Sequence, residues 1–136
     1  MKNTATRPHI GGGRPTTVLL LQQDVFIRTS IAEYLRICGY RVFEALSTDE
    51  AIGILEKSPE TIGVVLSDAE NGFALSRWTK TNRPKLRVIL AASVERTARA
   101  AANLCDSGPQ GKRPYDPQLL VQRIKVSQAG GDGSSS

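Results

Sequence analysis

Histidine is nearly absent from this sequence, and its scarcity excludes several kinds of chemistry. The chain has one histidine, His9, in a segment near the N-terminus that also holds three consecutive glycines. A histidine-based metal site or a Ser–His catalytic relay needs an imidazole inside the folded domain. The sequence therefore predicts no enzyme of the histidine-dependent classes.

Cysteine is scarce as well. Cys38 and Cys105 lie far apart in the sequence, form no Cys-x-x-Cys pair and have no histidine nearby. Isolated cysteines of this kind usually behave as small hydrophobic residues of the core. The sequence predicts two buried, reduced thiols.

Long apolar runs are also missing. No stretch approaches the roughly 20 apolar residues that a membrane-spanning helix needs. The N-terminus has no apolar core of the kind found in secretory signals, so a cytoplasmic location is expected.

Acidic residues are missing from the first 17 positions, which carry Lys2, Arg7 and Arg14. A basic N-terminal segment therefore contributes a large part of the net charge of +5, and the positive and negative charges of the rest of the chain are closer to equal in number. A basic segment of this kind is typically solvated, so nucleic acid is an unlikely partner.

The 136 residues suffice for one domain with a core of its own, but not for two. Residues 1–16 are rich in glycine and proline, which predicts a flexible arm. Residues 128–136 are rich in glycine and serine, which predicts a disordered tail. The folded domain is expected at residues 17–127.

The domain alternates between two kinds of segment. Short apolar runs at 18–21, 64–66 and 88–90 are typical of parallel strands buried on both faces, and the more alternating 40–45 suits a strand nearer the sheet edge. Helical spacing follows each run: at 27–38 with a stop at Gly39, from Ser47 or Thr48 through Glu56, at 72–80, at 94–104, and from Pro117 onward. This order predicts an α/β fold with an open parallel sheet and helices on both faces.

Polar residues follow the predicted strands, where such sheets place their sites. These residues are Gln22, Gln23 and Asp24 after the first strand, Ser67 and Asp68 at the third, Ala92 and Ser93 after the fourth, and Lys112, Arg113 and Pro114 after an expected fifth strand.

The chain resembles the receiver domain of bacterial two-component response regulators, the CheY-like family, over about residues 17–126. The resemblance rests on VLLLQQDVFIR with YLRICGYRV, on VVLSD at 64–68, NGFAL at 71–75, RPKLRVIL at 83–90 and KRPYDPQLL at 112–120. It implies a flavodoxin-like, doubly wound sheet of five parallel strands in the order 2-1-3-4-5. The polar, Gly- and Pro-rich segment 106–112 predicts that the fifth strand is weak and lies at the edge.

The resemblance also implies a phosphoryl-transfer site, and this sequence departs from it. Asp68 occupies the phosphoacceptor position, and the loop after it is shorter than usual in the family. Five positions carry other residues than the family uses. Gln22 and Gln23 replace the acidic pair that holds Mg²⁺, and Ala92 replaces the hydroxyl residue, with Ser93 following. Gln110 replaces the aromatic switch residue, and Arg113 replaces the lysine before the retained Pro114.

These departures predict a weakened metal site. A hard cation needs carboxylate oxygen, so no metal and no cofactor are expected, and Mg²⁺ enters only if the site still works. Asp24 is a possible compensating acid, with Asp68 as the second ligand. We also expect Asp68 and Arg113 to form an internal ion pair in the space that the metal and phosphate would occupy.

Three functions remain open at this stage. The favoured one is a stand-alone pseudo-receiver, not an enzyme, that acts by protein–protein contacts with a histidine kinase, a phosphotransfer protein or another signalling protein, or as a homodimer. The alternative is a working receiver that a histidine kinase phosphorylates at Asp68. The third is a small-ligand or nucleic-acid binding module that uses the same crevice.

Overall fold

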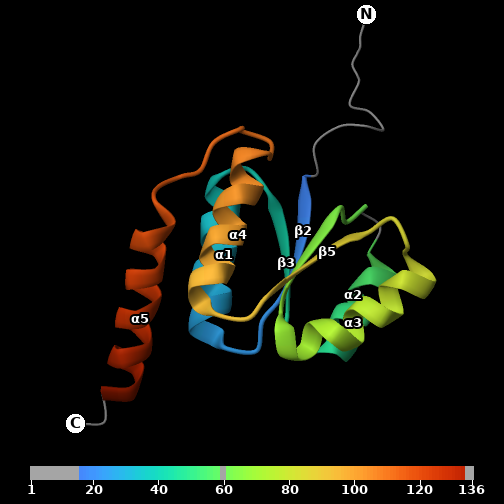
Figure 1. Ribbon diagram of the computed structural model, residues 1–136, viewed down its shortest axis with the longest axis horizontal. Coiled ribbons are helices and arrows are strands. Elements are labelled where there is room, and N and C mark those ends of the chain that lie inside the picture. The colour runs from blue at the N-terminus through green and yellow to red at the C-terminus, as the bar shows by residue number, and fades with distance from the viewer. Residues whose placement is uncertain (1–15, 59–60, 134–136) are drawn as a thin grey trace, which may run out of the picture.

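The computed structural model describes residues 16–58 and 61–133. These residues form four strands and five helices. Strands and helices alternate up to α4, and α5 then follows α4 without a strand between them (Figure 1). In chain order they are β2 (Thr17–Leu21), α1 (Val25–Ile37), β3 (Arg41–Ala45), α2 (Thr48–Lys57), β4 (Val64–Asp68), α3 (Ala69–Asn82), β5 (Arg87–Ala91), α4 (Val94–Asp106) and α5 (Pro117–Gly133).

The four strands form one parallel sheet in the order β3-β2-β4-β5. Leu21 pairs with Ala45 on one side and with Ser67 on the other, so the carboxyl ends of the strands lie at the same edge. The α/β class and the strand order are confirmed for the four strands, and β3, the alternating strand, is at an edge as expected.

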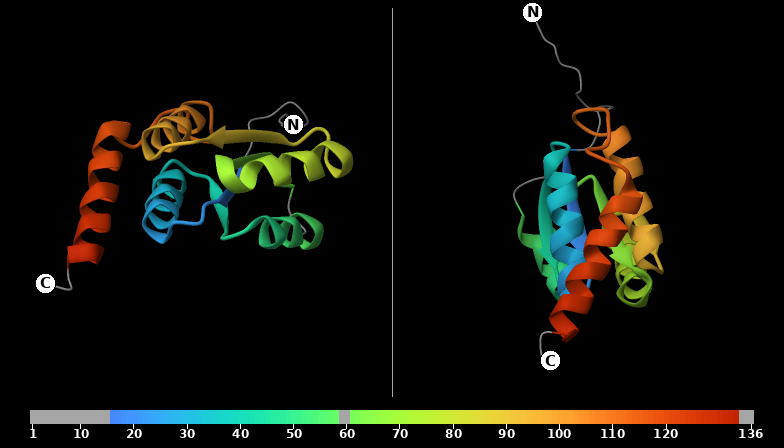
Figure 2. Two further views of the ribbon diagram at one scale, coloured as in Figure 1. Left: turned by 60° about the horizontal axis from the view of Figure 1, so that its bottom comes forward. Right: turned by 90° about the vertical axis from the view of Figure 1, so that its left-hand side faces the viewer.

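Alternation along β2 divides the core between the two faces of the sheet. Val18 and Leu20 pack with α1, α4 and α5, whereas Leu19 and Leu21 pack with α2 and α3. All four side chains are almost fully buried, as expected for a central strand covered by helices on both faces. Figure 2 shows the two helical layers and the sheet between them.

No fifth strand is present in the part of the chain that the structure describes. Residues 107–116 form turns and bends after α4, and the chain then enters α5 directly. Gln128, late in α5, donates to Asp24 at the start of α1, and Lys125 pairs with Glu95 at the start of α4. Helix α5 therefore runs antiparallel to α1 and α4 and in the same direction as the strands, along the α1–α4 layer (Figures 1 and 2).

Helix α5 also reaches further than the sequence predicts. It continues to Gly133, so much of the segment expected to be a disordered tail is helical. The hydrogen bond of Gln128 to Asp24, at 3.2 Å, ties this part of the helix to the domain. The predicted N-terminal arm, apart from residue 16, and residues 134–136 lie outside the described residues.

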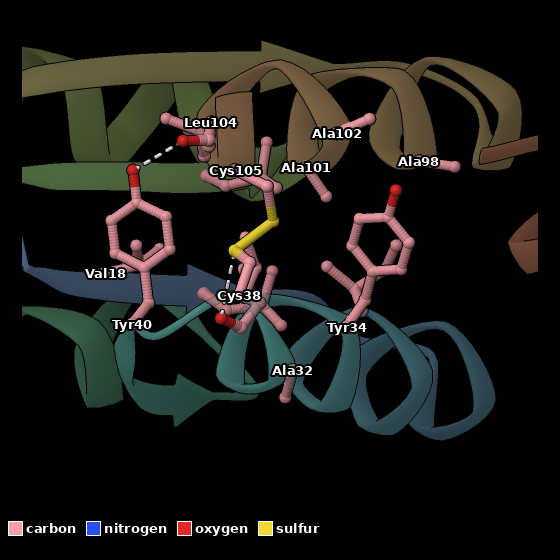
Figure 3. Close-up of a cluster of buried hydrophobic side chains, with 14 of the residues drawn as sticks. Val18, Ala32, Tyr34, Cys38, Tyr40, Ala98, Ala101, Ala102, Leu104 and Cys105 are labelled. Atoms are coloured by element: carbon pink, nitrogen blue, oxygen red, sulfur yellow. Dashed lines mark hydrogen bonds between the residues drawn. A yellow bond between two sulfur atoms is a disulfide. The ribbon is translucent and has the colours of Figure 1, made fainter. Parts of the chain in front are cut away.

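The prediction of two reduced thiols is wrong: Cys38 and Cys105 form a disulfide (Figure 3). Both are buried, at the C-cap of α1 and in the last turn of α4, and their Cα atoms lie 5.6 Å apart. That separation is in the usual range for a disulfide. The sequence did not show the pair because 67 residues separate the two cysteines.

The chain makes a close turn beside the disulfide. The phenol of Tyr40 donates to the carbonyl of Leu104 at 2.7 Å (Figure 3). A Cβ on Gly108 would lie 2.7 Å from the phenol oxygen of Tyr40 and from two of its ring carbons, so no other residue fits there without displacing the ring. This contact packs the turn after α4 against the amino end of β3.

No helix among the described residues has the length and apolar character to cross a membrane.

Candidate functional site

The candidate site lies at the carboxyl edge of the sheet, at the lower side of Figure 1. Strands β2, β4 and β5 end there, and α1, α3 and α4 begin there. The structure brings Gln22, Gln23, Asp24 and Asp68 to this edge, with Ala92 and Ser93 after the neighbouring strand.

Gln22 stabilises the turn from β2 into α1. Its backbone N–H donates to the carbonyl of Ala45 at 3.0 Å, which extends the pairing with β3. Its side-chain Oε1 accepts from the N–H of Asp24 at 3.1 Å. The side chain is buried, so a neutral amide here avoids the free-energy cost of burying a carboxylate without a cation.

Gln23 meets Asp68 through its main chain. Its backbone N–H donates to Oδ2 of Asp68 at 3.2 Å, while its side chain is exposed. Because this contact uses the peptide group, it is compatible with any residue except proline at position 23.

Asp24 is the N-cap of α1. Its Oδ1 accepts from the N–H groups of Phe26 and Ile27 at 2.8 and 3.0 Å, and its Oδ2 accepts from Nε2 of Gln128 at 3.2 Å. Both carboxylate oxygens are thus engaged by α1 and α5. The sequence suggests this acid as a possible metal ligand, whereas the structure uses it as a cap, and Asp directly before a helix is a common N-cap.

Asp68 is the N-cap of α3. Its Oδ1 accepts from the N–H of Asn71 at 2.8 Å, and the side-chain amide of Asn71 donates to both carboxylate oxygens at 3.2 and 3.3 Å. Because α3 begins at Ala69, immediately after β4, the short loop leaves Asp68 at the capping position. Asn71 was missed as a site residue, because the helix-start signal at this position, three residues after the N-cap, is a Glu or Gln and not an Asn.

The first turn of α3 packs closely on the strand ends. A Cβ on Gly72 would lie 2.2 Å from Cδ2 of Leu90 and 3.0 Å from Oγ of Ser67. Glycine at this position lets the helix start directly above the strands, and this fixes Asp68 and Asn71 at the sheet edge.

The predicted ion pair between Asp68 and Arg113 is wrong. Arg113 pairs with Asp106 at 2.6 Å and donates to Asn103 at 3.3 Å, at the C-terminal end of α4. That end lies at the opposite edge of the sheet from Asp68. The cause is the missing fifth strand, which would have carried the chain across the sheet to the carboxyl edge before residue 113.

The Arg113–Asp106 pair is a surface contact. The hydrogen bond from Arg113 lowers the pKa of Asp106, and the same bond raises the pKa of Arg113. Both side chains are more than a third exposed, so solvent screening leaves the pair a small share of the stability.

The other predicted switch positions are dispersed. Ser93 is the N-cap of α4 and accepts from the N–H of Arg96 at 3.1 Å, and Ala92 before it is exposed. Gln110 lies beside Gly39, after the end of α1, and Pro114 follows a trans peptide bond. Gln110, Arg113 and Pro114 therefore lie away from Asp68, and Ser93 already acts as a cap.

A guanidinium stands near the carboxyl edge in addition to the predicted residues. Arg28, in α1, donates to the backbone carbonyl of Gln22 at 3.0 Å and pairs with Glu44 of β3 at 3.3 Å. Its side chain is only 13% exposed. The sequence does not reveal this pair, because Glu44 is 16 residues away on a strand whose register only the fold sets.

These donors do not fit Mg²⁺. The described residues contain no group of three or more Asp, Glu, His or Cys side chains that could hold a metal ion, and the carboxylates of Asp24 and Asp68 cap helices. Mg²⁺ in proteins is bound through carboxylates and waters in near-octahedral geometry. Replacing a carboxylate near 4 Å by a neutral amide removes about 4 kcal/mol of attraction for each unit of cation charge at an effective dielectric of 20.

The sequence and structure were compared with known proteins. No family model matches the chain. A curated cyclic di-GMP phosphodiesterase of Thermotoga maritima is 24% identical over 115 residues, which are 83% of this chain. The chain spans 30% of the length of that relative.

Solved structures of receiver domains are similar to this fold. A response regulator receiver domain protein of Clostridium thermocellum has a TM-score of 0.54 at 24% identity, covering 82% of this chain and 93% of its own. A CheY-like receiver domain protein of Methanospirillum hungatei has a TM-score of 0.53 at 21% identity, covering 88% of this chain and 98% of its own. The chemotaxis regulator CheY4 of Vibrio cholerae has a TM-score of 0.52 at 18% identity, covering 82% and 98%.

The chain therefore has the fold of CheY-like response regulator receiver domains. The order of its four parallel strands agrees with this fold.

Proposed function

We propose that this chain is a receiver-like module of two-component signalling that acts through protein contacts, without Mg²⁺-dependent phosphorylation of Asp68. The observation that carries the proposal is the engagement of the Asp68 carboxylate. Its two oxygens accept hydrogen bonds from the backbone of Gln23 and from the backbone and side chain of Asn71.

Phosphoryl transfer to an aspartate needs a free carboxylate oxygen aligned with the phosphorus and positive charge on the transferring oxygens. At this edge Asp68 caps the N-terminus of α3. The two positions at which acidic residues would hold a cation carry the neutral Gln22 and Gln23. The arginine expected to face the phosphate pairs with Asp106 at the other edge. The chain thus keeps the receiver scaffold and uses the former acceptor as a helix cap.

The partners that suit this reading are signalling proteins, such as a histidine kinase or a phosphotransfer protein, or a second copy of the chain. The module itself catalyses no reaction in this proposal. The alternative, a working receiver phosphorylated at Asp68 by a histidine kinase, keeps one supporting observation: Asp68 is partly exposed at the carboxyl edge.

One experiment separates the two readings. The chain is incubated with Mg²⁺ and a small acyl phosphate such as acetyl phosphate, and its intact mass is measured. We expect no phosphate adduct on the unaltered chain. An adduct that disappears in the Asp68→Asn variant would show a working receiver and would end the pseudo-receiver proposal.

A matched pair of variants tests the cause. Gln22→Asp with Gln23→Asp restores the acidic pair and should increase Mg²⁺ affinity, measured by titration calorimetry. Gln22→Asn with Gln23→Asn changes the same positions without adding charge and should leave Mg²⁺ affinity unchanged. Equal Mg²⁺ affinities in the two double variants would mean that the neutral amides at positions 22 and 23 do not cause the weak Mg²⁺ binding.

A further inference from the structure

Strand β5 is an open edge of the sheet. It pairs with β4 on one side, and among the described residues no backbone group pairs with its other side. In a parallel strand every second residue directs its N–H and C=O to the same neighbour, so a row of donors and acceptors faces outward along Arg87–Ala91. The strand is partly exposed, and Leu90 is 37% exposed.

The surroundings of this edge are strongly basic. No acidic residue occurs between positions 71 and 94, while five basic residues do: Arg77, Lys80, Arg83, Lys85 and Arg87. All five are exposed, and none pairs with a carboxylate in the described parts of the chain. Arg96 in α4 is exposed and unpaired by the same criterion.

The strand directs different side chains to its two sides. On the α4 side, a hollow of about 130 Å³ is lined by Arg87, Asn103 and Ser107 together with the apolar Ile89, Ala100 and Leu104. Arg96 lies on the same helical face as Ala100 and Asn103, so arginines stand at both ends of this side. The α4 side therefore favours carboxylates.

On the α3 side, the side chains that the strand itself contributes are apolar. A hollow of about 220 Å³ there is lined by Leu86 and Val88, together with Lys80, Arg83 and polar residues of α3. Leu90 points to the same side, because its Cδ2 lies against Gly72 of α3. Apolar side chains of an added strand would pack on this side.

We propose that the β5 edge binds an extended acidic segment of a partner protein, which adds to the sheet as a further strand. Its carboxylates face Arg87 and Arg96 on the α4 side, and its apolar side chains face Leu90 and Val88 on the α3 side. This inference rests on the proposed function, in which output passes through protein contacts, and it names the chemistry of the partner. The added strand takes the position that the chain's own fifth strand leaves vacant.

Other occupants fit the edge less well. A second copy of β5 would bring Arg87 and the basic residues of α3 against their own counterparts, and like charges across a strand pair are destabilising. Nucleic acid would meet the positive charge but would leave the outward carbonyl groups of β5 and the apolar side of the strand without matching partners. An acidic strand satisfies the charge, the backbone groups and the apolar side together.

The test uses a fluorescein-labelled peptide of about six residues, the usual length of a strand, in which glutamate alternates with valine. Binding to the full chain is followed by fluorescence anisotropy, and protection of residues 87–91 by hydrogen exchange. We expect saturable binding that weakens with salt, slower exchange in β5, and at least about tenfold weaker binding to the Arg87→Glu/Arg96→Glu variant, a loss of about 1.4 kcal/mol.

Two controls separate strand addition from charge alone. A peptide with the same composition but with its glutamates and valines in two blocks should bind at least about tenfold more weakly, because it cannot present one acidic and one apolar face. The Lys57→Glu/Arg123→Glu variant changes the same charge on α2 and α5 and should bind like the unaltered chain.

Three results would overturn the proposal: no binding of the alternating peptide, equal binding of the block peptide, or tighter binding of a single-stranded oligonucleotide that also protects β5. Each is distinct from a failure of the proposed function, because the phosphate-adduct measurement does not involve β5. A chain that binds the peptide and also forms the adduct would keep this surface and lose only the pseudo-receiver assignment.

Discussion

At the scale of single residues, the same side-chain types that signal catalysis in this fold serve local structure here. Asp24 and Ser93 follow strands at the carboxyl edge and Asp68 ends one, and all three are N-caps. A carboxylate at a strand end can hold a cation or begin a helix, and the residues around it decide which. Here the N–H groups at the starts of α1 and α3 donate to the carboxylates of Asp24 and Asp68.

Tyr34 gives a prediction about pH. Its buried phenol, whose hydroxyl donates to the carbonyl of Tyr115, has a pKa above the ordinary value of about 10, chiefly because burial disfavours the phenolate. A raised pKa in the folded state adds stability that is present below pH ~10 and is lost as pH rises through the folded pKa. We expect the free energy of unfolding, measured by urea denaturation, to fall as the pH rises above about 10.

The Tyr34→Phe variant should lose about 1 kcal/mol near neutral pH, the usual contribution of such a hydrogen bond, and should show a shallower alkaline decline. Tyr115→Phe is the matched control, because Tyr115 is less buried and should keep the steep decline. An identical alkaline profile in the unaltered chain and Tyr34→Phe would mean that another group causes the loss.

At the scale of elements, the start of α3 explains why Asp68 serves as a helix cap. Helix α3 begins one residue after Asp68 and packs on the strand ends through Gly72. The carboxylate is thereby part of the helix start, and its removal should act on stability through the cap.

The prediction follows from the preference of N-cap positions for Asp, Asn and Ser. Asp68→Ala should lower the free energy of unfolding by about 1 kcal/mol, and Asp68→Asn should change it by a few tenths, because asparagine also caps well. Ser93→Ala, which removes the ordinary cap of α4, is the reference for the size of the effect. Chemical denaturation with a fixed m-value measures all three.

The opposite result is equally informative. Acids held at a working site commonly cost stability, so replacing one often stabilises the protein. If both Asp68→Ala and Asp68→Asn stabilise the chain, Asp68 is held as a reactive group and its role as a cap is secondary.

At the scale of the whole molecule, the sequence predicts the four parallel strands well, but it predicts the segment after α4, residues 107–133, poorly. Runs such as 18–21 and 64–66 carry their own signal, because strands buried on both faces must be apolar. The conformation of residues 107–133 depends on contacts between segments that are distant in the sequence, and no local pattern reveals such contacts. Examples are the hydrogen bond of Gln128 with Asp24 and the ion pair of Lys125 with Glu95. The ion pair of Asp68 with Arg113 was predicted wrongly because it assumed a fifth strand.

The disulfide is the other long-range feature that the sequence concealed, and it gives the last prediction. It joins α1 to α4 near the turn that leads to α5, and it closes a loop between positions 67 residues apart. In the chain-entropy account, cross-linking a loop of this length disfavours the unfolded state by about 4 kcal/mol. The unfolding midpoint of the oxidised chain in urea should therefore fall when the chain is fully reduced before the measurement.

The Cys38→Ala/Cys105→Ala variant tests the origin of this effect. Its midpoint should lie below that of the oxidised chain and should not respond to a reductant, because no bond remains to break. Both sulfur atoms are buried, so reduction of the folded chain should be slow and should accelerate in mild denaturant, as mass labelling of free thiols would show. Rapid labelling of Cys38 and Cys105 in the untreated chain would contradict the disulfide and would restore the prediction of two buried thiols.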